Sequence, residues 1–285
     1  MKTGLLPLIH PLKMTEFLSH FRNNEPFVVH HDSNEHLELR SFSLPNLLSS
    51  WTDSVQVHLP DLRDEASAVD VPAAEAKKMF EEGMGILFND INRFYPLLQD
   101  WVDTLKSDLG ISAQTYGRSL IYVTPDGKGT APHFDQNINF VLQVSGTKTW
   151  TMGKNSSVMN PMVRHTMGQP VDPEMMSYLI EPMAEQMPAK IMRFELKPGS
   201  LLFVPRGMWH ETQAEGEALS LNFTFTAPTW ADLFLAALRS RLVLSPEWRE
   251  SAVVSEEEKF ASLLESLKEE LPHWNASDIL EATET

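Results

Sequence analysis

The chain has 285 residues, and its 23 Lys and Arg against 39 Asp and Glu give a formal net charge of −16. The 42% apolar composition is enough for a substantial core, which excludes a disordered, collagen-like or low-complexity chain. The absence of cysteine excludes disulfide scaffolds, thiolate nucleophiles, iron–sulfur clusters and Cys-ligated zinc, so any metal must be held by His, carboxylates or neutral oxygens.

Charge and hydropathy also limit the partners. A general nucleic-acid-binding protein needs basic patches that replace phosphate counterions, and an acidic chain is better suited to a basic partner. No stretch of about 20 apolar residues is long enough to cross a bilayer, and residues 1–13 lack the apolar core of a secretion signal. We therefore expect no nucleic-acid partner, no membrane partner and a cytoplasmic location.

The first part of the chain, residues 1–115, predicts a mixed α/β region that packs on the core. Helical spacing of apolar residues predicts helices over three segments, and β-branched runs predict two strands. The predicted helices span 14–22, 72–84 and 95–109, the last ending at Gly110, and the predicted strands span 26–30 and 54–59.

Residues 116–228 differ in texture, because short runs rich in Val, Ile, Phe and Thr are separated by turn signals at 125–129, 145–146, 198–199 and 214–217. Many short strands with such turns predict an antiparallel barrel or a double-sheet sandwich.

The last part, residues 229–285, predicts helices over 230–244 and from Glu256 onward. In the second of these, Ser255 and Glu258 fit a capping box. Its apolar stripe from Phe260 to Leu271 can pack on its own barrel or on a second subunit, and we favour a homodimer through these helices.

A metal site is suggested by the His-x-Asp motif of His133 and Asp135. In an extended strand these two side chains project from one face and can bind one ion, while Phe134 packs on the other face. The same spacing occurs at 30–32, and a His-x-Glu lies at 36–38. Because those two lie in a polar, turn-rich stretch, we interpret them as a solvated loop.

A third ligand is supplied by His210, which follows a Pro-Gly turn, an apolar strand and a tight turn at Arg206-Gly207. The alternative is a buried histidine satisfied by a backbone carbonyl. Two histidines and one carboxylate form a facial triad that leaves coordination positions open on the metal.

These segments resemble a known family. Residues 129–135, 143–150 and 198–210 are similar to the JmjC-type Fe(II)- and 2-oxoglutarate-dependent oxygenases, and 80–88, 108–110, 122–129 and 230–234 to their ribosomal-oxygenase branch. The resemblance implies a mainly β protein with flanking helices, whose double-stranded β-helix (jelly-roll or cupin) core spans 116–228. It further implies Fe(II) held by His133, Asp135 and His210, with 2-oxoglutarate and O2 as co-substrates.

The resemblance also implies a co-substrate pocket. Lys148, which we place on a strand returning from the 145–146 turn, matches the lysine that anchors the distal carboxylate, although an exposed edge-strand lysine is the alternative. Asn139 shares strand parity with His133 and Asp135. Thr130 and Asn222 match 2-oxoglutarate contacts of related asparaginyl hydroxylases, and we add Tyr122 as a pocket residue.

The function expected from these features is hydroxylation of an amino-acid side chain in a protein or peptide, for which a basic substrate would suit the acidic chain. Alternatives are an oxygenase acting on a small molecule or an N-methyl group, a non-oxygenase metal-binding cupin, and an interaction module built on the C-terminal helices. Residues 229–285 leave no room for the complete winged helix of the ribosomal-oxygenase branch, so a ribosomal target does not follow.

Overall fold

The computed structural model describes residues 3–31, 39, 41–58 and 68–284. The chain divides into two compact units, which are described separately. The sheet unit, as we call it below, comprises Met1–Gly110 and Tyr116–Thr226, and the C-terminal unit comprises Ile111–Thr115 and Ala227–Thr285.

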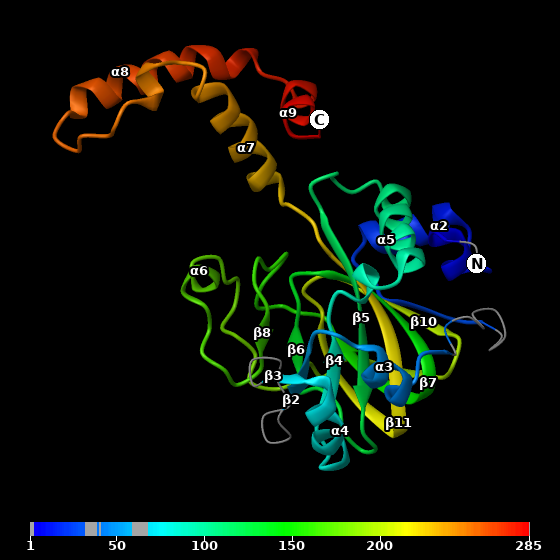
Figure 1. The fold of residues 1–285 in the computed structure, drawn as a ribbon. Helices are drawn as coiled ribbons and strands as arrows, with labels where there is room; N and C mark the ends of the chain where they lie inside the picture. The colour runs from blue at the N-terminus through cyan, green and yellow to red at the C-terminus, as the bar shows by residue number, and fades with distance from the viewer. Residues whose placement is uncertain (1–2, 32–38, 40, 59–67, 285) are drawn as a thin grey trace. The chain divides into compact units, whose positions relative to one another are not determined.

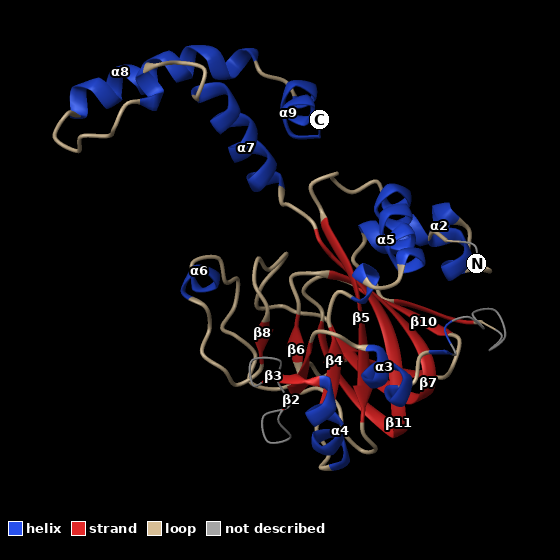
Figure 2. Cartoon of the chain, in the orientation of Figure 1, coloured by secondary structure: helices blue, strands red, loops and turns tan. Residues whose placement is uncertain are grey.

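The sheet unit is built on one antiparallel sheet, in which the described residues form eleven strands (Figure 2). The strand order is β1-β10-β7-β11-β5-β4-β2-β3, with β6 and β9 pairing onto β11 and β7, and β8 onto β6. The strands are β1 (Phe27–His30), β2 (Ser54–His58), β3 (Ala68–Pro72), β4 (Gly85–Phe88), β5 (Tyr116–Thr124), β6 (His133–Phe134), β7 (Ile138–Gly153), β8 (His165–Thr166), β9 (Ile191–Leu196), β10 (Ser200–Val204) and β11 (Trp209–Thr226).

Two long strands, β7 and β11, form the centre of the sheet. They pair from Ile138 opposite Phe225 to Gly153 opposite Trp209, and the register shifts twice, between Glu215 and Leu219 and between Leu219 and Ser220. Strand β10 pairs with the first half of β7 and β9 with the second half. The bend in the two strands therefore gives the halves of β7 different neighbours.

The turns predicted at 145–146 and 214–217 are wrong as strand ends, because β7 and β11 continue through both segments. Gly146 has φ 67°, and a Cβ there would lie 2.1 Å from the Glu217 carbonyl oxygen. The glycine thus permits a sharp bend and close approach inside a paired strand, and pairing with the neighbouring strand overrides the local turn signal.

The region 1–115 contributes strands at both edges of this sheet. β1 pairs with β10, and β4 pairs with β5. The helices predicted at 14–22 and 95–109 are confirmed, whereas the one predicted at 72–84 ends at Glu81 and is followed by β4. The helices of the sheet unit are α1 (Leu5–Ile9), α2 (Met14–Arg22), α3 (Leu44–Ser50), α4 (Ala73–Glu81), the 3-10 helix η3 (Ile91–Arg93), α5 (Pro96–Leu109) and α6 (Pro173–Met176) (Figure 1).

A buried aromatic cluster fixes the strands that carry the candidate metal ligands. Phe134 in β6 packs edge-on against Trp209 in β11, with ring centroids 4.8 Å apart, and Val158 and Met175 complete the cluster. Phe134 thus faces away from the site, as the sequence predicts. Because Phe or Trp truncation in a core costs roughly 3–5 kcal/mol, this cluster holds β6 on β11.

The C-terminal unit is helical, with α7 (Trp230–Leu242), η4 (Glu247–Arg249), α8 (Glu257–Glu270), η5 (Leu271–His273) and α9 (Ala276–Glu284). The capping box predicted at Ser255 is wrong: the N-cap of α8 is Glu256, without a side-chain cap, because a turn closed by Glu256 N–H to Val253 O includes Ser255. A capping box does form at α7, where Thr229 Oγ1 accepts from the Asp232 amide at 3.1 Å and Asp232 Oδ2 accepts from the Thr229 amide.

In the part of the chain that the structure describes, no helix combines the length and the apolar character that crossing a bilayer requires.

Candidate metal and co-substrate site

The three predicted metal ligands meet at one point of the sheet unit. His133 in β6 lies directly opposite His210 in β11, with ring centroids 4.1 Å apart. Asp135, just after β6, has Oδ2 4.0 Å from His133 Nε2 and 3.7 Å from His210 Nε2. One ligand atom from each residue therefore lies within 4.8 Å of the others, a spacing at which three atoms can bind a single ion.

The histidine hydrogen bonds prepare both rings for a metal. His133 Nδ1 lies 2.7 Å from the Ala131 carbonyl oxygen, and His210 Nδ1 lies 2.9 Å from that of Met208. Because a carbonyl only accepts, each Nδ1 donates a proton, and the lone pair of each Nε2 points toward Asp135. The backbone contact expected for a merely structural histidine is thus present, and it leaves Nε2 of each ring facing Asp135. The donor set fits Fe(II).

The two oxygens of Asp135 have different partners. Oδ2 faces the histidines and accepts from Asn139 Nδ2 at 3.3 Å, while Oδ1 lies 3.3 Å from Arg164 Nε. Arg164 also donates to Thr166 Oγ1 at 2.8 Å, which ties it to β8. Sequence reasoning missed Arg164, since it lies in the irregular segment between β7 and β9, where no periodicity indicates its direction.

The eight predicted site residues all line one cavity of about 80 Å³ in the sheet unit. The lining residues are Arg118, Leu120, Tyr122, Thr124, Thr130, His133, Asp135, Asn137, Asn139, Lys148, Trp150, His210, Thr212, Ser220, Asn222 and Thr224. Asn139 reaches the cavity although the strand is interrupted between Phe134 and Ile138, because its amide hydrogen-bonds Asp135. The structure therefore brings the predicted residues together.

Lys148 lies in this cavity with only 4% of its surface exposed, so the alternative of an exposed edge lysine is wrong. Its Nζ lies 2.8 Å from Thr124 Oγ1 and 3.5 Å from Ser220 Oγ, and burial lowers the pKa of Lys148 to about 8. Among the described residues no carboxylate forms an ion pair with it. A buried ammonium surrounded only by hydroxyl groups is a suitable anchor for an anion.

Thr124 and Ser220 were not predicted, although the sequence carries a signal for both. Thr124 shares strand parity with Tyr122, and Ser220 shares it with Asn222. The two hydroxyls therefore enter the cavity beside residues that had been identified.

The remaining predicted pocket residues lie around the lysine and the triad. Thr130 N donates to Thr212 Oγ1 at 3.0 Å, and this contact requires a glycine beside it, since a Cβ at Gly129 would lie 1.7 Å from the Thr212 carbonyl oxygen. Asn222 Oδ1 is buried and has no hydrogen-bond partner in the described parts of the chain. An orphaned polar atom beside the triad is typical of a side chain that meets a ligand.

The competing motif at 30–32 lies elsewhere. His30 ends β1, with Nδ1 2.7 Å from Ser200 Oγ, and His31 Nε2 lies 2.6 Å from the Leu8 carbonyl oxygen. His30 is thus the last residue of the strand predicted over 26–30 and does not lie in the solvated loop that we assigned to the two motifs, while Asp32 and the motif at 36–38 lie outside the described residues.

Comparison with known proteins relates the chain to a domain family. A model of the JmjC domain matches residues 100–233. The chain is 34% identical over 276 residues to the uncharacterized protein YxbC of Bacillus subtilis (strain 168), covering 93% of this chain and 82% of YxbC. It is 27% identical to ribosomal oxygenase 1 of Rattus norvegicus, covering 59% of this chain but only 26% of that protein.

The fold is shared with a solved structure. YcfD, a ribosomal oxygenase from Escherichia coli in complex with cobalt and 2-oxoglutarate, superposes with a TM-score of 0.56 at 19% identity, over 92% of this chain and 68% of YcfD. This confirms the predicted jelly-roll architecture. With the matched domain and the relationship to YxbC, it follows that the chain belongs to the JmjC-domain family, the family of 2-oxoglutarate-dependent oxygenases that its motifs resemble.

Proposed function

We propose that this protein is an Fe(II)- and 2-oxoglutarate-dependent oxygenase that hydroxylates an amino-acid side chain of a protein or peptide. The observation that carries the proposal is that one cavity holds both the His133, Asp135 and His210 triad and the buried ammonium of Lys148. A metal-binding cupin with another activity needs the triad but has no use for a cation placed to bind a dicarboxylate.

Each residue has a defined task in this proposal. His133, Asp135 and His210 hold the iron, which supplies the redox chemistry that couples decarboxylation of 2-oxoglutarate to oxidation of a substrate C–H bond. Asn139 and Arg164 fix the Asp135 carboxylate, so that one of its oxygens faces the histidines.

The co-substrate end of the cavity is formed by Lys148, whose ammonium binds the distal carboxylate of 2-oxoglutarate together with the hydroxyls of Thr124 and Ser220. Thr130, Asn222 and Tyr122 line the same cavity as the lysine and the triad. Lys148, Ser220 and Asn222 are buried, which limits the access of water to the anion and strengthens each charge-assisted hydrogen bond.

A protein substrate is supported by the relatives named ribosomal oxygenase, although this chain covers only about a quarter of such a relative. A basic target suits the net charge of −16. Searching tryptic peptides for a +16 mass shift that depends on the protein identifies a protein substrate. Oxidation of a small molecule or of an N-methyl group in place of this shift would contradict side-chain hydroxylation and would favour one of those two alternatives.

The activity test uses the purified full chain. With Fe(II) and ascorbate it should bind one metal per chain and convert 2-oxoglutarate slowly to succinate without any prime substrate, measured by NMR of both acids. The triad variant Asp135→Ala is the control and should give no succinate. Tight metal binding without any 2-oxoglutarate binding would instead indicate the metal-binding cupin.

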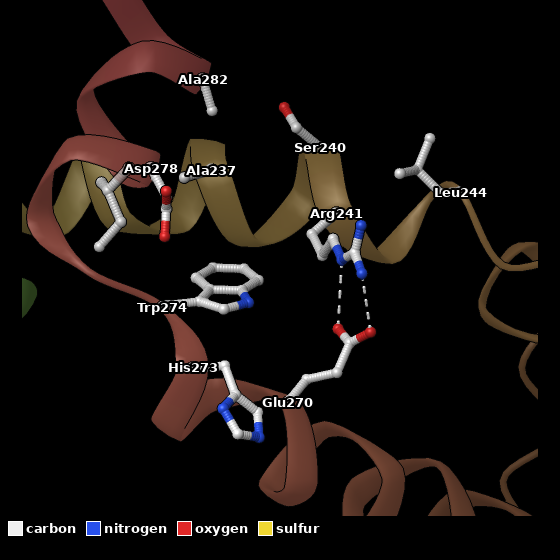
Figure 3. A pocket seen from close by; sticks show the side chains of 10 residues that line it. Ala237, Ser240, Arg241, Leu244, Glu270, His273, Trp274, Asp278 and Ala282 are labelled. Carbon is white, nitrogen blue, oxygen red and sulfur yellow. Dashed lines mark hydrogen bonds and ion pairs between the residues drawn. The ribbon is translucent and has the colours of Figure 1, made fainter.

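We also infer a homodimer through the C-terminal unit, because this unit buries little of its own apolar surface. No residue of α8 is buried, and Trp230, Leu244 and Phe260 are 80%, 67% and 55% exposed. Between α7, η5 and α9 lies a cavity of about 510 Å³ beside Trp274, bordered by the two-hydrogen-bond pair of Arg241 and Glu270 (Figure 3). Exposed apolar surface of this extent is typical of an interface.

The dimer is tested by sedimentation velocity of the full chain at micromolar concentration. Phe260→Glu should weaken self-association at least tenfold, since it places a charge in an apolar interface. Val69→Glu, a similar change on β3 of the sheet unit, should leave self-association unchanged. A wild-type chain that sediments as a monomer at tens of micromolar would contradict the inference.

A further inference from the structure

Arg118 lines the cavity beside the metal triad and has no task in the proposed reaction so far. It lies on β5 opposite Thr224 of β11, and Thr224 lies opposite Asn139 of β7. Thr224 Oγ1 donates to Asn139 Oδ1 at 2.7 Å, and Asn139 in turn contacts Asp135. With neighbouring strands about 4.8 Å apart, the Arg118 and Asn139 backbones are roughly 10 Å apart, so Arg118 belongs to the metal end of the cavity.

Lys148 marks the other end. Its ammonium contacts Thr124, which lies at the opposite end of β5 from Arg118, about 20 Å further along the strand. A co-substrate anchored at Lys148 and reaching toward the triad therefore does not occupy the space at Arg118. That space lies at the metal end of the cavity, away from the lysine that anchors the co-substrate, and a substrate to be oxidised must approach this end.

The surroundings of Arg118 provide no counter-ion. The side chain is part-buried, and in the described residues it forms neither a hydrogen bond nor an ion pair. Asp90 accepts from Tyr116 Oη at 3.1 Å, and Asp135, which is the one carboxylate among the cavity-lining residues that the structure describes, faces Arg164. A guanidinium that faces a cavity without an anion is costly, and a bound anion relieves this cost.

The charge of the site favours a carboxylate over a phosphate. One guanidinium carries a single charge in a planar fork, which matches the charge and geometry of a carboxylate. A phosphate group carries about −1.5 to −2 and generally requires several donors. At this end of the cavity Arg118 is the only described cation that lines the wall.

We propose that Arg118 determines substrate specificity by binding a carboxylate of the prime substrate, so that the substrate is an acidic side chain of a protein or a small carboxylic acid. The proposal rests on the oxygenase function proposed above. It also refines the expectation of a basic target: the net charge of −16 can attract a basic protein, but the cavity itself selects an acidic group next to the oxidised carbon.

The test measures binding rather than turnover. The full chain is loaded with Mn(II) and saturating 2-oxoglutarate, and occupancy of both is confirmed first. Three probes are then titrated: blocked Gly-Gly-Asp-Gly-Gly, its Asn counterpart, and N-acetylglycine as a small acid. Paramagnetic relaxation of the probe protons by Mn(II) reports binding beside the metal, because the effect falls off steeply with distance.

We expect one or both carboxylate probes to relax strongly and the Asn peptide to show no effect. Arg118→Gln should weaken carboxylate binding about tenfold or more, and Arg118→Lys should restore part of it, since it keeps the charge but loses the fork. Arg193→Gln, the same change on exposed β9, should have no effect. Binding of the peptide alone indicates a protein substrate, and binding of N-acetylglycine alone indicates a small acid.

The inference is overturned if no carboxylate probe binds, if the Asn peptide binds equally well, or if Arg118→Gln leaves carboxylate binding unchanged. Each of these results with Mn(II) and 2-oxoglutarate bound leaves the oxygenase function standing. Failure to load Mn(II) and 2-oxoglutarate would instead contradict the proposed function itself.

Discussion

Replacing His133 with alanine is expected to abolish metal binding, weakening the affinity for Fe(II) or Mn(II) more than 100-fold. Loss of a partner that only orients a ligand costs about 10–100-fold, and His133→Ala removes one of three ligands outright. The remaining pair, Asp135 and His210, cannot define a facial site. Equilibrium dialysis of the full chain with Mn(II), followed by elemental analysis, measures the stoichiometry.

The matched control is His30→Ala, which changes the histidine of the other His-x-Asp motif. His30 Nδ1 contacts Ser200 Oγ at a distance from the triad, so this variant should still bind one metal per chain. His133→Ala leaves the Ala131 carbonyl without its donor, so the free energy of unfolding is expected to fall by about 1–3 kcal/mol. Circular dichroism must therefore show that the variant folds. Loss of metal in His30→Ala but not in His133→Ala would show that the ligands had been misassigned.

Strand parity predicted part of the site, because the side chains of a strand alternate between its two faces. His133, Asp135 and Asn139 share this parity and reach one cavity, whereas Lys148 does not share it and was predicted from its place after the 145–146 turn and from the family resemblance. The parity argument for Asn139 succeeds across an interruption of the strand because the Asn139 amide bonds to Asp135 and to Thr224. In this site side-chain hydrogen bonds preserve the alternation where the backbone ladder stops.

The failures have tertiary causes. Gly146 and Gly216 resemble turn residues locally, yet both have positive φ inside strands that their neighbours hold together. Arg118 gave no signal, because nothing in a single sequence shows that a charged residue on a strand faces a cavity and not solvent. Arg164 comes from an irregular segment without periodicity. Arg118 is identified only by the strand pairing that places it on the cavity wall, and Arg164 only by its ion pair with Asp135.

Lys148→Met is expected to weaken 2-oxoglutarate binding about 100-fold while the metal still binds, because it removes the ammonium that a buried carboxylate requires. Lys148→Arg should keep part of the affinity, since it retains the charge but not the fit between Thr124 and Ser220. Lys154→Met, on an exposed position just after β7, is the matched control and should bind normally. Calorimetric titration of the Mn(II)-loaded chain measures all four proteins, including wild type.

Lys148→Met should also raise the free energy of unfolding of the chain when 2-oxoglutarate is absent. The pKa of Lys148 is lowered from 10.5 to about 8 by burial, so the unfolded chain binds the extra proton between these values. The burial cost, about 3 kcal/mol, is therefore fully present below pH 8 and disappears as the pH rises toward 10.5. At pH 7 we expect Lys148→Met to unfold at a higher temperature than wild type, and the difference to vanish near pH 10.5.

Adding 2-oxoglutarate should reverse this order, because only wild type gains binding energy from the ligand. Since the ligand needs the protonated amine, wild-type affinity should fall about tenfold per pH unit above pH 8, and binding at pH 9 should take up nearly one proton, seen as a dependence of the heat on the buffer. A variant that keeps wild-type affinity and shows the same proton uptake would mean that another cation anchors the co-substrate. The stability and binding results together separate a lysine held at a cost for its ligand from one that merely supports the fold.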